Sequence, residues 1–277
     1  MEQKKTAYIA SVDQKVFPKS IQPVYHLGHS IPNPNKKELP CHWDSIVYLF
    51  QNYDELIIIG NLLPNDRMLQ GSLTHYTEMI LSLFYEASIC FHKDVFVCLN
   101  GQKTIPLHEI VKGKLPEIAK QLCDDGMTMS ASQNTVMSVQ KISVYNDLSA
   151  SQWALQYFKW LKRFTVGLIE VKVSGENYPF CIKGFNNHPL LSLKKNNEFN
   201  LDEVAEIIIQ GGFLNKERHL LTPAGRFWFV KRGDYLYTAL VHFKPALPWL
   251  SYRLTQGWIH GVVMQRFSKW VTKQKSH

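Results

Sequence analysis

The pattern of residues 149–183 constrains the fold most, because it specifies a helix and a β-hairpin in direct succession. Ser149 and Gln152 have the spacing of a capping box, in which each side chain binds the backbone amide of the other residue. Apolar and aromatic residues then recur at helical spacing over 153–164, and two runs typical of strands flank a Ser-Gly-Glu-Asn turn. The sequence therefore predicts an α+β fold of mixed helices and short antiparallel sheets.

The rest of the chain divides into three regions. Residues 1–40 contain five prolines and predict an extended arm. Residues 41–125 predict an N-terminal α/β region, with helices at 42–50 and 73–89, strands at 55–60 and 94–99, and interrupted helix over 107–122. Small polar residues at 125–140 predict a boundary, followed by a basic C-terminal region over 141–277.

Four further elements are expected in the C-terminal region. Asn200 can cap a helix over 201–210, and Gly211-Gly212 can end it. Strands at 227–230 and 235–243 flank a Lys-Arg-Gly-Asp turn, and a terminal helix covers 258–271.

One stretch of this region, GFLNKERHLLTPAGR at 212–226, resembles the end of winged-helix DNA-binding domains. The resemblance covers about fifteen residues and implies a short strand, a charged turn and an LTPxG segment that closes a wing. The helix and hairpin at 149–183 likewise have the outline of a recognition helix followed by a wing. We therefore expect winged-helix-like units in the C-terminal half, although a helix usually follows the motif in that family and 227–230 is typical of a strand.

Positive charge is concentrated in the C-terminal half. Residues 1–150 carry a net charge of −2, whereas residues 151–277 carry +10. Residues 222–277 hold nine basic residues and one acid, together with eleven aromatic residues. A clustered field of one sign favours a polyanionic partner, and interleaved rings and cations are typical of surfaces that bind single-stranded nucleic acid or RNA.

The candidate contacts follow from this pattern. Phosphate contacts in a helix-and-wing module come from basic residues on both elements, and Arg266, Lys269 and Lys273 are spaced so that they share one helix face. The predicted nucleic-acid-binding residues are Lys159, Lys162, Arg163, Lys172, Lys183, Arg226, Trp228, Lys231, Arg232, Arg253, Arg266, Lys269 and Lys273.

Motifs of metal sites and of common enzymes give no comparable signal. His26, His29 and the pair Cys41-His42 have a spacing that zinc tolerates, but adjacent ligands in a proline-rich segment are unusual. GxSxG, GxxxxGK[ST] and GxGxxG motifs are absent. The sequence therefore predicts no metal, no cofactor and no catalytic residue.

These observations favour a non-enzymatic nucleic-acid-binding protein: a regulator, an initiator or a subunit of a nucleoprotein complex with other protein subunits. The alternatives are a subunit of an RNA-guided or RNA-processing complex, an enzyme of unfamiliar family acting on an anionic substrate, and a protein of an anionic membrane surface. A cytoplasmic location is expected, because five scattered cysteines suggest reduced thiols and no apolar run is long enough to span a bilayer.

Overall fold

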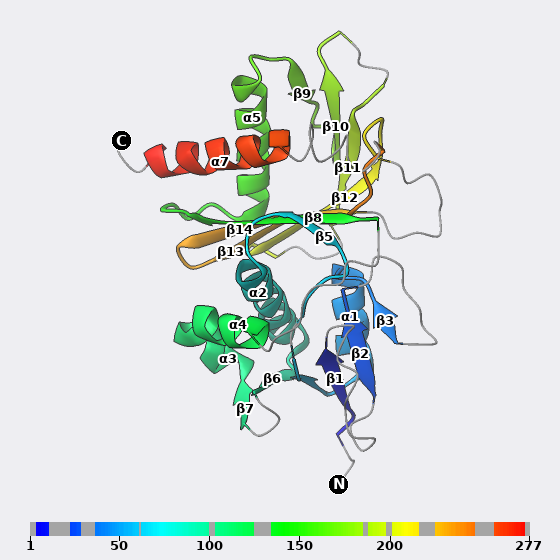
Figure 1. The fold of residues 1–277 in the computed structure, drawn as a ribbon, viewed down its shortest axis with the longest axis vertical. Coiled ribbons are helices and arrows are strands. Elements are labelled where there is room, and N and C mark those ends of the chain that lie inside the picture. Colours follow the sequence, from blue (N-terminus) through cyan, green and yellow to red (C-terminus); the bar gives the residue numbers. More distant parts are fainter. Residues whose placement is uncertain are drawn as a thin grey trace. The chain divides into compact units, whose positions relative to one another are not determined.

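The computed structural model describes residues 4–10, 23–28, 37–60, 62–99, 103–124, 134–184, 188–197, 201–215, 225–246 and 258–274. The chain forms helices and mixed sheets, in agreement with the predicted α+β class (Figure 1). It divides into two compact units. Unit 1 consists of Met1–Asp66 and Ser72–Gln133, and unit 2 consists of Arg67–Gly71 and Asn134–His277.

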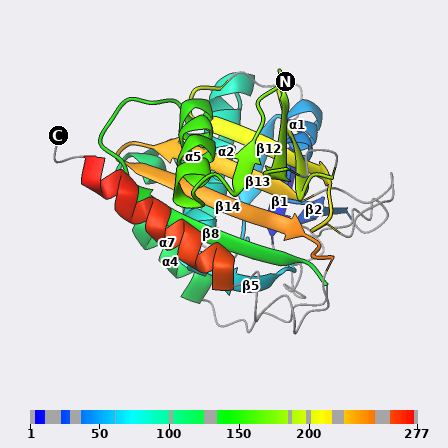
Figure 2. The ribbon, with the colours of Figure 1, turned by 90° about the horizontal axis from the view of Figure 1, so that it is seen from above.

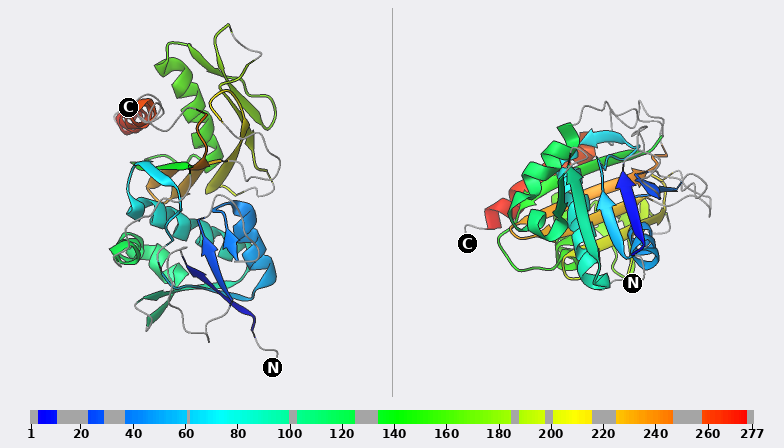
Figure 3. Two further views of the ribbon diagram at one scale, coloured as in Figure 1. Left: turned by 45° about the vertical axis from the view of Figure 1, so that its right-hand side comes forward. Right: turned by 90° about the horizontal axis from the view of Figure 1, so that it is seen from below.

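Unit 1 is built on a six-stranded sheet (Figure 3, right). Its strands are parallel except at one edge, where β7 is antiparallel to β6. Three segments within residues 1–40, for which the sequence predicted an extended arm, form strands of this sheet. The strand order is β3 (Glu38–Leu39), β2 (Val24–Leu27), β1 (Thr6–Ala10), β4 (Glu55–Ile58), β6 (Asp94–Leu99) and β7 (Lys103–Pro106).

Helices connect the strands of unit 1. The helices and strands predicted between residues 42 and 99 are confirmed, and the interrupted helix at 107–122 consists of two short α-helices joined by a π-helical turn. These elements are α1 (Trp43–Asn52), α2 (Leu73–Phe91), α3 (Leu107–Glu109), the π-helix η2 (Ile110–Lys114) and α4 (Leu115–Asp124).

Unit 2 is built on an eight-stranded sheet. All neighbouring strands are antiparallel except β5 and β8, which are parallel. The strand order is β5 (Arg67–Gln70), β8 (Val136–Ser143), β14 (Tyr235–Phe243), β13 (Arg226–Arg232), β12 (Val204–Gly211), β11 (Leu191–Lys195), β10 (Asn177–Ile182) and β9 (Ile169–Val171).

Two helices, α5 (Ala150–Phe164) and α7 (Trp258–Lys273), cover one face of this sheet (Figure 2). Alternate residues of each central strand face them, because successive side chains of a strand point to opposite faces. Tyr157 of α5 lies at the centre of this core. Its ring centroid is 5.5 Å from that of Phe227 in β13 and 5.0 Å from that of Phe267 in α7. The aromatic residues of these elements therefore fill much of the core.

The helix predicted at 201–210 is wrong. This segment forms β12, in which Ala205, Ile207 and Ile209 face the helices. Three consecutive isoleucines favour a strand, because β-branched side chains pack well on a pleated surface. The expected second helix-and-wing unit therefore does not form around this segment.

The first helix-and-hairpin pattern is present but belongs to a larger sheet. Helix α5 is followed by the β9–β10 hairpin as predicted, and the hairpin forms the edge of the eight-stranded sheet. Residues 216–224, most of the stretch that resembles winged-helix domains, lie outside the described residues. The described residues therefore show a helix packed on an antiparallel sheet, and they do not establish a winged-helix unit.

Loss of the α5 cap is expected to destabilise the chain by about 1 kcal/mol. The Ser149 hydroxyl accepts the Gln152 amide at 3.2 Å, and the Gln152 carboxamide oxygen accepts the Ser149 amide at 2.8 Å. Ser149→Ala leaves one of these amides without its partner, and urea unfolding measures the loss. Ser174→Ala is the matched control, because Ser174 is exposed and bonds Asn177 through backbone atoms. Equal effects of the two substitutions would contradict the role of the cap.

Candidate nucleic-acid interface

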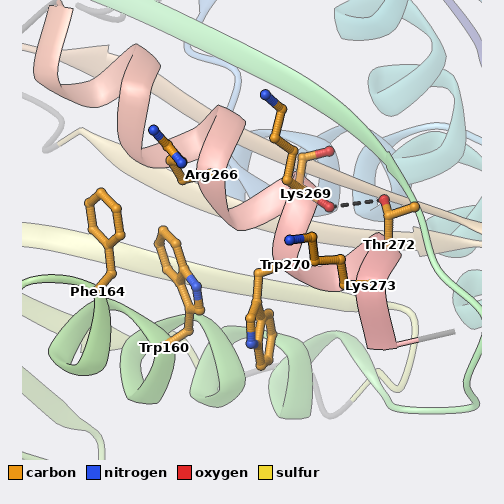
Figure 4. A pocket seen from close by; sticks show the side chains of 8 residues that line it. Trp160, Phe164, Arg266, Lys269, Trp270, Thr272 and Lys273 are labelled. Atoms are coloured by element: carbon orange, nitrogen blue, oxygen red, sulfur yellow. Dashed lines mark hydrogen bonds between the residues drawn. The ribbon is translucent and has the colours of Figure 1, made fainter. Parts of the chain in front are cut away.

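A groove between α5 and α7 combines aromatic rings with positive charge (Figure 4). The two helices lie next to each other on the sheet, and α7 is seen nearly end-on beside α5 in Figure 3, left. The groove encloses a volume of about 640 Å³, within the range of ligand-binding cavities. We refer to it as the α5–α7 groove. It is lined by Trp160, Phe164, Arg266, Ser268, Lys269, Trp270, Thr272 and Lys273.

The rings of the groove belong to an aromatic cluster that begins in the core and contains two stacked pairs. Trp160 and Phe164 lie one helical turn apart on α5, and their rings are stacked at 4.8 Å with an interplanar angle of 13°. On α7, Phe267 and Trp270 are stacked at 5.8 Å. Trp160 joins the two pairs, because its ring lies 5.2 Å from Phe267. Trp160 and Phe267 are buried, whereas Phe164 is 38% exposed, so the packing of the core holds the outer rings in place.

The cations of the groove come from one face of α7. Arg266, Lys269 and Lys273 are spaced three and four residues apart and are exposed, and Figure 4 shows their side chains on the side of the groove formed by α7. No ion pair between described residues involves any of the three. Like charges that lack acidic partners repel each other, and an anionic ligand relieves that repulsion. The sequence-based prediction that these three residues share a face is confirmed.

A second set of cations surrounds Glu170 on β9. The Lys162 ammonium lies 2.9 Å from the Glu170 carboxylate. This hydrogen-bonded contact lowers the pKa of Glu170, and the charges of Lys183 and Lys172 lower it further. The structure therefore brings together three of the residues predicted on α5 and its hairpin. Lys159 and Arg163 are also exposed on α5.

Two predicted contact residues are buried, which corrects the sequence-based prediction. Arg226 of β13 is an ion-pair partner: its Nε lies 3.2 Å from Oε1 of Glu206, and the two side chains are 7% and 3% exposed. Trp228 is completely buried. Because a ligand cannot reach either side chain in the folded chain, neither belongs to the candidate interface.

Two further predicted residues, Lys231 and Arg232, are not among the described residues that line the groove. Lys231 is 3.8 Å from the carboxylate of Asp147, and its side chain is 13% exposed. Arg232, at the end of β13, is partly buried. Arg253 lies outside the described residues.

Sequence reasoning missed the aromatic half of the groove. Trp160, Phe164 and Trp270 were not expected as contact residues. A signal for them exists, since Trp160 and Phe164 are four residues apart, and Phe267 and Trp270 alternate with Arg266 and Lys269. That alternation places rings and cations on adjacent faces of one helix.

Another cavity in unit 2 has a different character. It has a volume of about 860 Å³ and lies at the ends of β11 and β12. Its only ionisable lining residue within the described part of the chain is His188, and its lining includes Phe213, which is 75% exposed. The described residues that line it include no cluster of cations, so they do not match a polyanion.

Metal sites and membrane-spanning helices are both absent from the described residues. No group of three or more histidine, cysteine, aspartate or glutamate residues in the described ranges is placed to hold a metal ion. No helix in those ranges combines the length and apolar character needed to cross a membrane.

The groove thus presents three cations that form no ion pair with the described residues, beside stacked rings of which Phe164 is partly exposed. Comparison of the chain with protein-family models, with curated proteins and with solved structures finds no match.

Proposed function

We propose that this chain binds nucleic acid through the α5–α7 groove, without catalysis of its own, as a regulator, an initiator or a subunit of a nucleoprotein complex. One observation carries the proposal: Arg266, Lys269 and Lys273 line the same cavity as the stacked rings of Trp160 and Phe164, and Phe164 is 38% exposed. Cations that neutralise phosphates and rings that stack on bases are the two components of nucleic-acid binding without sequence specificity.

Basic residues around the groove support a contact with nucleic acid that extends beyond the groove itself. Residues 151–277 carry a net charge of +10. Lys159 and Arg163 are exposed on α5, and Lys172 and Lys183 are exposed on the hairpin that follows it. A strand leaving the groove along α5 meets these additional cations, as in helix-and-wing modules, where both elements contact phosphates.

A second candidate function is peripheral binding to an anionic membrane surface. Three exposed aliphatic residues support it, namely Val166 at 93%, Leu168 at 60% and Val173 at 59%, near the basic residues around Glu170. Apolar side chains beside cations suit the interface of an anionic bilayer. These aliphatic side chains lie outside the lining of the groove, so the two functions have separable determinants.

Fluorescence anisotropy with labelled single-stranded RNA, single-stranded DNA and duplex DNA, each across a salt series, tests the proposed function. Binding that weakens steeply with salt is the expected result, because neutralised phosphates release counterions. Flotation with vesicles of anionic phospholipid tests the second candidate. If the chain binds none of the three nucleic acids at low salt but floats with the vesicles, membrane binding replaces nucleic-acid binding as the proposed function.

A further inference from the structure

The rings of the α5–α7 groove are accessible only in part. Phe164 is the outermost ring of the stack at 38% exposed, while Trp160 behind it is 6% exposed. A phosphate contact does not need such a ring, because phosphate is bound by cations and hydrogen-bond donors. A partly exposed ring that rests on a second, nearly parallel ring is instead suited to stack against a flat apolar face of a ligand.

Only some kinds of nucleic acid can contact both the cations and the aromatic rings of the groove. In a duplex the faces of the bases are covered by neighbouring base pairs, so a duplex offers only phosphates to the cations of α7. In a single strand the bases can separate from each other and stack on aromatic side chains. A ligand that meets Arg266, Lys269 and Lys273 through phosphates and also reaches Phe164 must therefore have an unpaired base.

Resting on the proposed function, we propose that the α5–α7 groove binds single strands selectively by stacking one unpaired base on Phe164 while the α7 cations hold the adjacent phosphates. The cavity of about 640 Å³ accommodates a group of this size. The site discriminates single strands from duplexes because only the former can supply the base.

The described lining of the groove has few uncharged polar groups that could distinguish one base from another. The hydroxyl of Thr272 donates to the backbone oxygen of Ser268 at 3.0 Å, so its proton is already committed. Ser268 is the other hydroxyl in the lining. Every base has a π-face, and stacking is therefore tolerant of sequence. We expect little preference among homopolymers of equal length.

The experiment compares oligonucleotides that differ only in their bases. The probes are a labelled oligothymidine of about 16 nucleotides, an abasic oligomer of the same length and backbone, and a duplex of that length. The full chain is expected to bind oligothymidine about fivefold to 150-fold more tightly than the abasic oligomer, the range that corresponds to one base stacked on an aromatic ring. Phe164→Ala is expected to remove most of that difference and to leave the affinity for the abasic oligomer unchanged.

Three variants control for packing and for nonspecific effects. Phe164→Tyr retains the π-face and is expected to preserve the discrimination, whereas Phe164→Leu retains apolar volume without the π-face and is expected to lose it. Phe213→Ala removes a more exposed ring outside the groove, and it is expected to bind all three probes as the unaltered chain does.

The outcomes separate this inference from the proposed function. Equal affinity of the unaltered chain for oligothymidine and the abasic oligomer would overturn base stacking, while salt-dependent binding of both would leave nucleic-acid binding intact. Discrimination that persists in Phe164→Leu would also overturn the role of Phe164. Absence of binding to every probe at low salt would overturn the proposed function itself.

Discussion

Replacing Arg266, Lys269 and Lys273 together by alanine is expected to lower the affinity for a single-stranded oligonucleotide about a hundredfold at about 0.1 M salt. Each phosphate contact on a single strand contributes about 0.7 to the slope of log K against log salt concentration, so the slope is expected to fall by about 2. The loss of affinity should therefore shrink as salt is raised. Fluorescence anisotropy across a salt series measures the affinity and the slope in one experiment.

The matched control for this triple substitution lies in unit 1. Lys112, Lys114 and Lys120 are exposed, and replacing them by alanine removes the same charge from the chain. We expect this control to change the affinity little. If both triple variants lose affinity equally, binding depends on net charge and the groove is not the site. If neither loses affinity, the α7 cations make no phosphate contact.

Arg226→Ala is expected to reduce the free energy of unfolding by about 3–5 kcal/mol. The substitution leaves Glu206, which is 3% exposed, without the guanidinium that lies 3.2 Å from its carboxylate. Asn196 still donates to the other carboxylate oxygen at 2.8 Å, but an amide does not compensate a buried charge. Urea unfolding followed by circular dichroism gives the change in free energy.

Two comparisons test the cause of this loss. Lys231→Ala removes an ion pair whose acidic partner, Asp147, is fully exposed, and it is expected to cost at most about 1 kcal/mol. The double variant Arg226→Met with Glu206→Leu is expected to recover much of the stability, because it removes both charges and fills similar volume. If Arg226→Ala alone cost no more than Lys231→Ala, the buried pair would not be a major source of stability.

Local signals in the sequence predicted several elements well. The capping residues of α5, the turn between β13 and β14 and the cation spacing of α7 are patterns within a few residues. Each reflects geometry that a short segment imposes on itself, such as the 3.6-residue period that places Arg266, Lys269 and Lys273 on one face. Such features are readable without knowledge of the tertiary structure.

Other features depend on what a segment packs against. The segment 201–210 contains acidic residues suited to a helix start, yet pairing with β11 and β13 makes residues 204–211 a strand. Burial of Arg226 follows from Glu206, which lies twenty residues earlier. The groove likewise joins Trp160 and Phe164 to a helix about one hundred residues later. Sequence spacing gives no measure of these distances in space.

The placement of β5 has a consequence for how this protein can be divided or recombined. The chain passes between the two units after residues 66, 71 and 133, so neither unit is a continuous segment. A fragment that begins at Asn134 lacks β5 and leaves the edge of β8 without its partner strand. Exposed strand edges promote aggregation. During synthesis β5 also emerges long before β8, so the larger sheet cannot be completed until most of the chain has been made. Fragments, fusions and chimaeras that aim to isolate the α5–α7 groove must therefore carry residues 67–71 with them.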